Sequence, residues 1–261
     1  MSFSLTVIGC GSATPVGTRL SSAFALRHRR QVFLIDCGEG TQMHLKEHHI
    51  HMQRISHVLV SHLHGDHFFG LAGLLSSMHL FGRSHPLNVF GPPELEHIIR
   101  YQLEVGGTEL RYPLTFVPTQ AEEPQLLFSD GHVEVMSFPL LHSLPTTGFL
   151  FREIRQNERH RPKSFAYCSD TCYTESILPY VKGVDLLYHE STFLRGEERL
   201  AVERFHSTAE QAAMLAQKAE VKRLLLGHYS ARYSDTHSFL EEAEGVFPES
   251  VLASEGLILN V

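Results

Sequence analysis

The sequence predicts a mixed α/β fold in which two β-sheets lie between layers of helices. About twelve short segments have the alternating or continuous apolar pattern of strands, and about six have helical periodicity. So many helices exclude an all-β sandwich, and the first half has too many strands for a regular alternation of strand and helix. No internal repeat and no Gly/Ser/Pro-rich linker divides the chain. Residues 1–261 are therefore expected to form one domain.

The predicted strands are rich in Val, Ile, Leu and Phe, and most end at Gly, Pro, Asp or Ser. They lie at Phe3–Gly9, Ala23–Arg27, Gln31–Ile35, His57–Val60, Leu87–Phe90, Leu114–Pro118, His132–Phe138, Gly148–Phe151, Phe165–Cys168, Val184–Tyr188, Arg223–Leu226 and Leu257–Val261. The predicted helices lie at Thr41–His49, Phe68–Phe81, Pro93–Val105, Glu175–Val181, Thr208–Ala219 and Ser238–Val246. Ser207 and Glu210 have the spacing of a capping box, so Ser207 is expected to be an N-cap.

The composition excludes several classes of protein. Of the 261 residues, 43% are hydrophobic and 20% are charged, a balance typical of globular chains and not of disordered ones. The net charge of −7 excludes a wholly basic nucleic-acid binder but not a local basic patch. No apolar run is long enough to cross a membrane, the pattern of an export signal is missing, and four cysteines are too few for a disulfide scaffold. We therefore expect a cytoplasmic protein with no membrane partner.

One short segment, residues 152–163, differs in composition from the rest of this acidic chain. It carries five Lys or Arg residues against two Glu residues. Such a charge run is often only the solvated tip of a hairpin, and it is also a local basic patch of the kind that nucleic acids bind. Composition alone leaves both interpretations open.

Histidine is over-represented, with 19 residues in a chain that has no Trp. Directly after the predicted strand His57–Val60 the chain reads Ser-His-Leu-His-Gly-Asp-His, an H-x-H-x-D-H motif. His62 and His64 project to the same side of an extended segment. The following turn brings Asp66 and His67 to a second position. Imidazole nitrogens and a carboxylate suit Zn²⁺ or a similar first-row ion, so the motif predicts a catalytic metal centre.

That motif has too few ligands for a two-metal centre, and three further candidates follow predicted strands. They are His142, Asp170 and His228. A rigid sheet can aim side chains placed at strand ends, while loops cover the site. Each residue alone is more typical of a turn or a cap, but together with the H-x-H-x-D-H motif they predict the rest of a dinuclear site.

A second group of residues indicates a general acid. Glu190 follows the predicted strand Val184–Tyr188, and His206 precedes the predicted helix Thr208–Ala219. The positive end of the helix dipole disfavours a charged imidazole, whereas a nearby carboxylate such as that of Glu190 favours it. The pair could then protonate a leaving group near neutral pH. The spacing equally allows Glu190 to cap a helix and His206 to be an exposed loop residue.

His189, which directly precedes Glu190, is counted with the second group, and twelve of the 19 histidines fit neither group. Four of these, His44, His48, His49 and His51, lie on or just after the predicted helix Thr41–His49. They could bind stray metal, but we expect them to be ordinary surface residues.

These residues resemble a known family. The H-x-H-x-D-H motif with His142, Asp170 and His228 is similar to the ligand set of the metallo-β-lactamase fold. The longer run from Ser61 to Leu71 resembles the signature of ribonuclease Z, the endoribonuclease that removes the 3′ trailer from tRNA precursors. Further matches are Ser169-Asp170-Thr171, His189-Glu190-Ser191-Thr192-Phe193, His206-Ser207-Thr208 and His228-Tyr229-Ser230-Ala231-Arg232-Tyr233. The resemblance implies an α/β (α+β) fold, a four-layer αββα sandwich of the metallo-β-lactamase type.

The resemblance also implies roles for the site residues. One metal ion would be held by His62, His64 and His142 and the other by Asp66, His67 and His228, with Asp170 bridging them. The expected cofactor is two Zn²⁺ ions per chain, although Mn²⁺ or another divalent ion also accepts these ligands. Asp66 would assist proton transfer, and Glu190 with His206 would protonate the departing 3′ oxygen. The resemblance thus implies a zinc-dependent phosphodiesterase that acts on tRNA precursors and forms a homodimer.

The chain departs from the ribonuclease Z pattern in its substrate-binding segments. Long forms insert a tRNA-binding arm between the residues that match His142 and Asp170, but only 28 positions separate the two here. The basic segment 152–163 stands in the place of the arm. The candidate RNA-binding residues are Arg19, Arg155, Arg159, Arg161, Lys163 and Arg232. The alternative is therefore an armless relative that hydrolyses small or cyclic phosphodiesters.

Overall fold

The computed structural model describes residues 3–17 and 19–261. These residues form two compact units, and each unit contains one seven-stranded β-sheet with helices beside it. Unit 1 comprises the described residues up to Thr119 together with Ser254–Asn260, and unit 2 comprises Gln120–Ala253 and Val261. The predicted mixed α/β fold with two sheets is confirmed, whereas the single domain stays a prediction.

The sheet of unit 1 has the strand order β16-β1-β3-β4-β5-β6-β7. Its strands are β1 (Phe3–Gly9), β3 (Ala23–His28), β4 (Gln31–Ile35), β5 (Ile55–Leu59), β6 (Leu87–Gly91), β7 (Leu114–Pro118) and β16 (Ile258–Asn260), and a short β2 lies at Gly11–Ser12. The strands from β4 to β7 pair in parallel. Parallel neighbours end at the same edge of a sheet, so Asp36 after β4 and Ser61 just after β5 are brought together.

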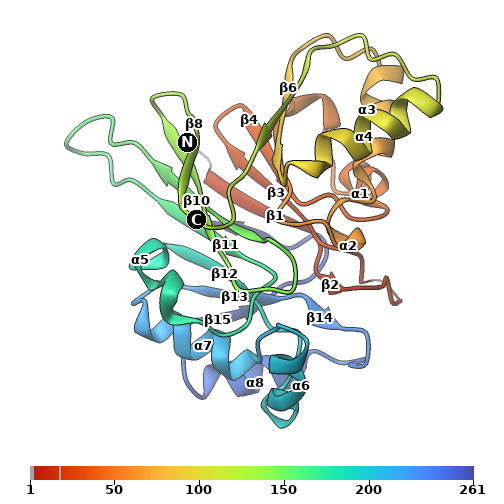
Figure 1. Ribbon diagram of the computed structural model, residues 1–261. Helices are drawn as coiled ribbons and strands as arrows, with labels where there is room; N and C mark the ends of the chain where they lie inside the picture. The colour runs from red at the N-terminus through yellow and green to blue at the C-terminus, as the bar shows by residue number, and fades with distance from the viewer. Residues whose placement is uncertain (1–2, 18) are drawn as a thin grey trace. The chain divides into compact units, whose positions relative to one another are not determined.

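The helices of unit 1 pack through apolar faces. They are α1 (Thr41–Glu47), α2 (Gly65–Phe68), α3 (Leu71–Leu80) and α4 (Glu94–Val105), with a 3-10 turn η1 at Met52–Arg54. α3 buries Leu71, Leu74 and Met78, which lie on one face because they recur at helical spacing. These side chains join Val58 of β5 and Val89 of β6 in one hydrophobic cluster. Figure 1 shows α3 and α4 packed next to each other beside β6.

The predicted helix Phe68–Phe81 is wrong at its start, because a break separates two helices there. α2 ends at Phe68, and α3 begins at Leu71. Gly70 stands at the break, where a Cβ atom would lie 2.1 Å from the carbonyl oxygen of Gly38. Only glycine allows the backbone to approach so closely. The break leaves α2 as a separate turn that carries two of the predicted metal ligands.

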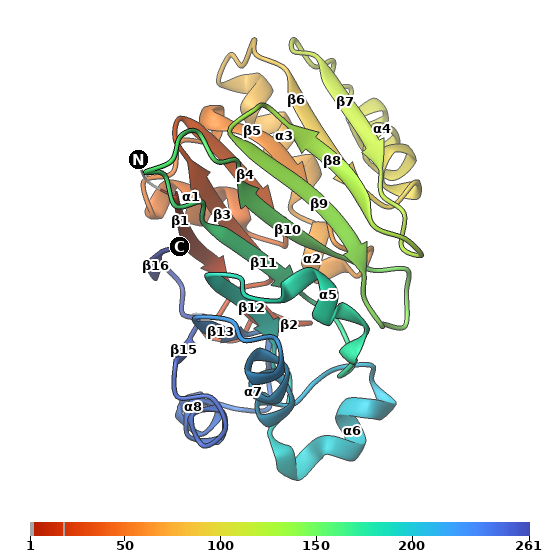
Figure 2. The same cartoon turned by 90° about the vertical axis from the view of Figure 1, so that its left-hand side faces the viewer.

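The sheet of unit 2 has the strand order β15-β13-β12-β11-β10-β9-β8, and Figure 2 shows β9 to β12 side by side. Its strands are β8 (Gln125–Ser129), β9 (Val133–Pro139), β10 (Thr147–Glu153), β11 (Ser164–Cys168), β12 (Leu186–Glu190), β13 (Leu224–Gly227) and β15 (Ser250–Leu252), and a short β14 lies at Tyr229–Ser230. β11, β12 and β13 pair in parallel. Their shared edge therefore carries Asp170 after β11, Glu190 at the end of β12 and His228 after β13.

The helices of unit 2 are α5 (Leu178–Val181), α6 (Glu198–Glu203), α7 (Ala209–Lys218) and α8 (His237–Glu244), with 3-10 turns η2 (Glu175–Ile177) and η3 (Arg195–Glu197). The predicted capping box of Ser207 and Glu210 is wrong by one residue. Thr208 is the N-cap of α7 and exchanges hydrogen bonds with Gln211. Ser207 instead donates its hydroxyl to the carbonyl oxygen of Thr171 at 2.8 Å, so its side chain is not available to cap α7. Within residues 3–17 and 19–261, none of the helices has the length and apolarity that a membrane span requires.

Candidate metal centre

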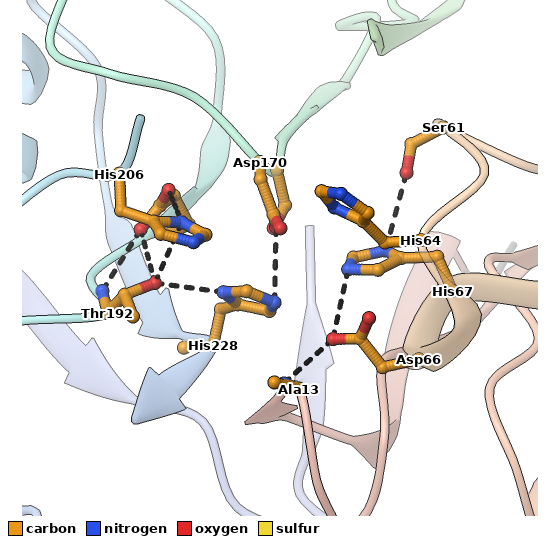
Figure 3. A network of polar contacts seen from close by, with 12 residues as sticks. Ala13, Ser61, His64, Asp66, His67, Asp170, Thr192, His206 and His228 are labelled. Carbon is orange, nitrogen blue, oxygen red and sulfur yellow. Dashed lines mark hydrogen bonds and ion pairs between the residues drawn. The ribbon is translucent and has the colours of Figure 1, made fainter. Parts of the chain in front are cut away.

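Unit 1 brings together the four residues of the H-x-H-x-D-H motif. His62 and His64 come from the extended segment after β5, and their Nε2 and Nδ1 atoms lie 3.0 Å apart. Asp66 and His67 come from α2, with 3.6 Å between Asp66 Oδ2 and His67 Nε2. The rings of His62 and His67 have their centroids 4.2 Å apart, and both residues are fully buried. The predicted clustering of this motif is therefore present in unit 1, and Figure 3 shows His64, Asp66 and His67 of the motif.

A buried carboxylate that the sequence reasoning missed holds one of these histidines. Oδ2 of Asp36 lies 2.7 Å from Nδ1 of His67. Asp36 also accepts hydrogen bonds from the backbone N–H and the hydroxyl of Ser61, at 2.8 and 3.0 Å. Because a carboxylate only accepts, His67 donates from Nδ1 and keeps the lone pair of Nε2 for a ligand. The available signal was the position of Asp36 directly after the predicted strand Gln31–Ile35.

The second carboxylate of unit 1 is held by the backbone. The N–H of Ala13 donates to Oδ2 of Asp66 at 2.8 Å, as Figure 3 shows. Ala13 has a φ of 60°, in the left-handed region. Asp66 is thus oriented by a contact from the loop after β2 that the sequence does not reveal.

Unit 2 brings together the other three predicted ligands. Nε2 of His228 lies 3.2 Å from Oδ1 of Asp170, and Nε2 of His142 lies 3.8 Å from Oδ2 of Asp170. Side-chain exposure is no more than 2% for any of them. His142 donates from Nδ1 to the carbonyl oxygen of Phe205 at 2.8 Å, so its Nε2 carries the lone pair. Burial lowers the pKa of His142, which favours the neutral ring that a metal requires.

Glu190 and His206 form a direct pair in unit 2. Oε1 of Glu190 lies 2.7 Å from Nδ1 of His206, and Glu190 is fully buried. Glu190 also accepts hydrogen bonds from the backbone N–H groups of Thr171 and Thr192, neither of which starts a helix. His206 has a side-chain exposure of only 14%. The helix-cap interpretation of Glu190 and the exposed-loop interpretation of His206 are therefore both wrong.

The charge of Glu190 follows from its surroundings. Burial alone would raise the pKa of this carboxyl, but the charge of His206 and the hydrogen bond to it outweigh burial. The pKa of Glu190 is therefore lower than its ordinary value. An anionic Glu190 holds a proton on Nδ1 of His206 and fixes the orientation of that ring.

Thr192, to which the sequence analysis assigned no role, connects the Glu190–His206 pair to the predicted metal ligand His228. Its Oγ1 donates to Oε2 of Glu190 at 2.7 Å and lies 2.9 Å from Nδ1 of His228. Since the hydroxyl has only one proton and donates it to the carboxylate, Oγ1 must accept a proton from His228 Nδ1. Nε2 of His228 then carries the lone pair, and it is the atom that contacts Asp170 in Figure 3. His189 takes no part in this network, because its Nδ1 bonds to the carbonyl oxygen of Glu190.

The donor atoms fit a divalent metal ion. All seven predicted ligands present imidazole nitrogens or carboxylate oxygens, the donors that Zn²⁺ and similar ions accept. Four imidazoles, those of His62, His67, His142 and His228, have their Nδ1 occupied by a carboxylate, a carbonyl or a hydroxyl. Such outer hydrogen bonds are typical of histidines that bind metal through Nε2. The chain therefore carries the donor sets of a divalent metal site.

The candidate RNA-binding residues have different surroundings. Arg155, Arg159 and Arg161 are exposed on the loop between β10 and β11. Nζ of Lys163 lies 3.5 Å from Oδ1 of Asp185, so this residue already has an anionic partner. The guanidinium of Arg232 lies over the ring of Phe193 and 3.8 Å from Oε1 of Glu197. Arg19 pairs with Val16 across a turn. Their contact with RNA stays a prediction.

The comparison with known families agrees with this fold and these donors. Residues 31–229 match the family model described as a beta-lactamase superfamily domain. The fold and the His/Asp donor sets thus define a protein of that superfamily, with the metallo-β-lactamase fold.

Full-length relatives narrow the class further. Ribonuclease Z of Parabacteroides distasonis is 38% identical to this chain over 99% of both proteins. Ribonuclease Z of Bacteroides thetaiotaomicron is 37% identical over 99% of this chain and 95% of that protein. The crystal structure of human tRNase Z, short form, is 31% identical, has a TM-score of 0.84 and covers 99% of both chains. The chain belongs to the ribonuclease Z family.

This chain is shorter than its bacterial relatives. The match to the protein of Parabacteroides distasonis spans 302 aligned positions, 41 more than the 261 residues of this chain. At least that number of positions in the relative therefore has no counterpart here.

Proposed function

We propose that this protein is a metal-dependent endoribonuclease that removes the 3′ trailer from tRNA precursors and leaves a 3′-hydroxyl. The observation that carries the proposal is the network in which Thr192 joins Glu190, His206 and His228. It places a carboxylate-held imidazole beside His228, whose Nε2 lies 3.2 Å from Oδ1 of Asp170, an arrangement suited to protonating a leaving group at a metal site. Membership of the ribonuclease Z family supports the same activity.

The proposed ligands are those that the ribonuclease Z resemblance assigns. His62, His64 and His142 would hold one ion and Asp66, His67 and His228 the other, with Asp170 as a shared ligand. We assign two Zn²⁺ ions per chain, with Mn²⁺ or another divalent ion as the substitute that the same donors accept. Divalent ions bound there supply Lewis-acid stabilisation of the phosphoryl oxygens and lower the pKa of a water molecule.

The side chains of this protein then handle the protons of the reaction. Asp66, held by the N–H of Ala13, accepts a proton from the water that attacks phosphorus. His206 gives a proton to the departing 3′ oxygen as the bond between phosphorus and that oxygen breaks. Glu190 holds the imidazole in place through Nδ1, so the proton that His206 transfers is the one on Nε2. The products are a 3′-hydroxyl on the tRNA and a 5′-phosphate on the trailer.

The proposed RNA contacts are the exposed arginines of the loop between β10 and β11, with Arg19 and Arg232 as further candidates. A homodimer supplies additional RNA-binding surface to a chain that lacks a full arm, and the cytoplasm is the proposed location. The alternative substrate is a small or cyclic phosphodiester. The net charge of −7 and the shorter chain favour this alternative.

Cleavage of a tRNA precursor tests the proposal. The metal-loaded protein is expected to cut a precursor just after the discriminator base and to release a trailer that begins with a phosphate. An Asp66→Ala variant serves as the control and is expected to be folded but inactive. Cleavage of bis(p-nitrophenyl) phosphate without cleavage of the precursor would support the alternative. Full activity of the Asp66→Ala variant would overturn the proposed site.

A further inference from the structure

Three potential metal-binding side chains lie outside the candidate metal centre, at the end of α1 in unit 1. They are His44, Glu47 and His48. Positions three and four residues apart lie on one face of a helix, so the three side chains are neighbours. One ligand atom from each lies within 4.8 Å of the others. Two imidazoles and one carboxylate at this spacing are a donor set that first-row divalent ions accept.

The contacts within this group pre-arrange His44. Its Nδ1 lies 2.9 Å from Oε2 of Glu47. A carboxylate bound to one ring nitrogen fixes the tautomer of a histidine and leaves the other nitrogen as a ligand. The side chain of His44 is 24% exposed and that of Glu47 is 64% exposed, so an ion and its water molecules can reach the group from solvent.

His48 is held in place by its backbone and by its ring. Its backbone N–H bonds to the carbonyl oxygen of His44 at 2.9 Å, which continues the helical geometry of α1. Its ring packs so closely on Gly256 that a Cβ there would lie 2.9 Å from a ring carbon. Nε2 of His48 is buried and, among the described residues, has no hydrogen-bond partner. A buried ring nitrogen without a partner is costly, and a bound metal is one way in which an imidazole nitrogen is satisfied.

We propose that His44, Glu47 and His48 form a second metal site, which binds one first-row divalent transition-metal ion such as Zn²⁺. The ion takes the two imidazoles and the carboxylate as ligands and keeps water in its remaining positions. It fixes the last turn of α1 and the ring on which Gly256 packs, so it stabilises unit 1. The site shares no ligand with the candidate metal centre and does not depend on the proposed function.

The same segment offers a matched control. His49 and His51 lie within a few residues of the group and are exposed, but neither belongs to it. Substituting this pair removes the same number of imidazoles from the same part of the surface. Any metal held only by general histidine content is lost equally from both variants.

The test counts Zn²⁺ per chain. Wild type, His44→Gln/His48→Gln and the control His49→Gln/His51→Gln are equilibrated with micromolar Zn²⁺, freed of unbound metal and analysed by mass spectrometry of the element. Wild type and control are expected to hold one ion more than the His44→Gln/His48→Gln variant. The comparison is a difference between chains, so the number of ions in the candidate metal centre does not affect it. Equal counts in wild type and this variant, or an equal loss in the control, overturn the proposal.

Two further variants keep the test decisive. His44→Gln alone leaves the ring of His48 on Gly256, so it replaces the double variant if that variant does not fold. Glu47→Gln is expected to weaken Zn²⁺ binding at this site by about tenfold or more, measured by calorimetric titration. Added Zn²⁺ is also expected to raise the Tm of wild type more than that of His44→Gln. An unchanged affinity in Glu47→Gln together with equal Tm shifts contradicts the proposal.

Discussion

Oδ2 of Asp36 lies 2.7 Å from Nδ1 of His67, and both side chains have an exposure of 0%. Asp36 follows β4, and His67 belongs to α2. The N–H and hydroxyl of Ser61 also bond to this carboxylate, so its two oxygens have fixed directions. Asp36 is therefore a positioning residue, which sets the tautomer and the direction of a proposed metal ligand.

Replacement of Asp36 by Asn is expected to weaken metal binding by about 10–100-fold. The amide oxygen keeps its bond to the N–H of Ser61, so the amide NH₂ is directed at Nδ1 of His67. The proton of the ring then moves to Nε2, and the lone pair for the metal is lost. Calorimetric titration with Zn²⁺ measures the effect, with exposed Asp235→Asn as the control. Wild-type affinity in a folded Asp36→Asn protein would falsify this role.

Thr192 is expected to matter through its hydroxyl and not through its size. Thr192→Val removes the donor to Glu190 and the acceptor for His228, and leaves buried polar groups without partners. We expect the cleavage rate in a single turnover to fall by about 10–100-fold in this variant. Thr192→Ser keeps the hydroxyl and is expected to retain most of the rate. If the two variants have equal rates, the hydroxyl does not position the pair.

The placement of the proposed ligands after strands was predictable because it depends on local sequence. His62, His64, Asp66 and His67 lie within six consecutive positions after a strand, and strand ends aim side chains in a definite direction. Asp170 and His228 likewise follow buried apolar runs that form parallel strands. The fold class followed from the same strand and helix patterns.

The supporting residues were not predictable, because their roles arise from contacts between distant segments. Asp36 is 31 positions from His67, and Thr192 is 36 positions from His228. Strand β8 (Gln125–Ser129) was also missed, and none of its residues is fully buried. The capping box moved by one residue because Ser207 bonds to Thr171, 36 positions away. Local propensity does not contain such information.

Asp185 is expected to make stability depend on pH. Burial alone would raise the pKa of this carboxyl, but hydrogen bonds from Lys222 and the N–H of Ser164, with the charges of Lys222 and Lys163, outweigh burial and lower it. A carboxyl whose pKa is lower in the folded protein stabilises the fold at pH values above its pKa in the unfolded chain, about 3.9. This contribution is lost as the pH falls through the lower pKa of the folded protein. We expect Asp185→Asn to lower the free energy of unfolding by about 1–2 kcal/mol at neutral pH.

Urea unfolding of wild type and Asp185→Asn at several pH values measures this contribution. The difference between the two proteins is expected to stay constant from neutral pH to about pH 5 and to shrink at lower pH. Exposed Asp235→Asn, which lacks the two lysines, is the control. A difference that grows on acidification contradicts the assignment.

The exposed arginines of the loop between β10 and β11 are expected to act on RNA substrates alone. Substitution of Arg155, Arg159 and Arg161 by Gln removes three positive charges that could contact phosphates. We expect KM for a tRNA precursor to rise by about an order of magnitude. The slope of log KM against log salt concentration is expected to fall by about two units, because fewer counterions are released on binding. The rate with bis(p-nitrophenyl) phosphate is expected to be unchanged. The control removes the same charge from exposed positions of unit 1, namely Arg27, Arg30 and Arg111. Equal KM values in the two triple variants would show that only net charge matters, whereas a change specific to the loop variant identifies the loop as the RNA contact.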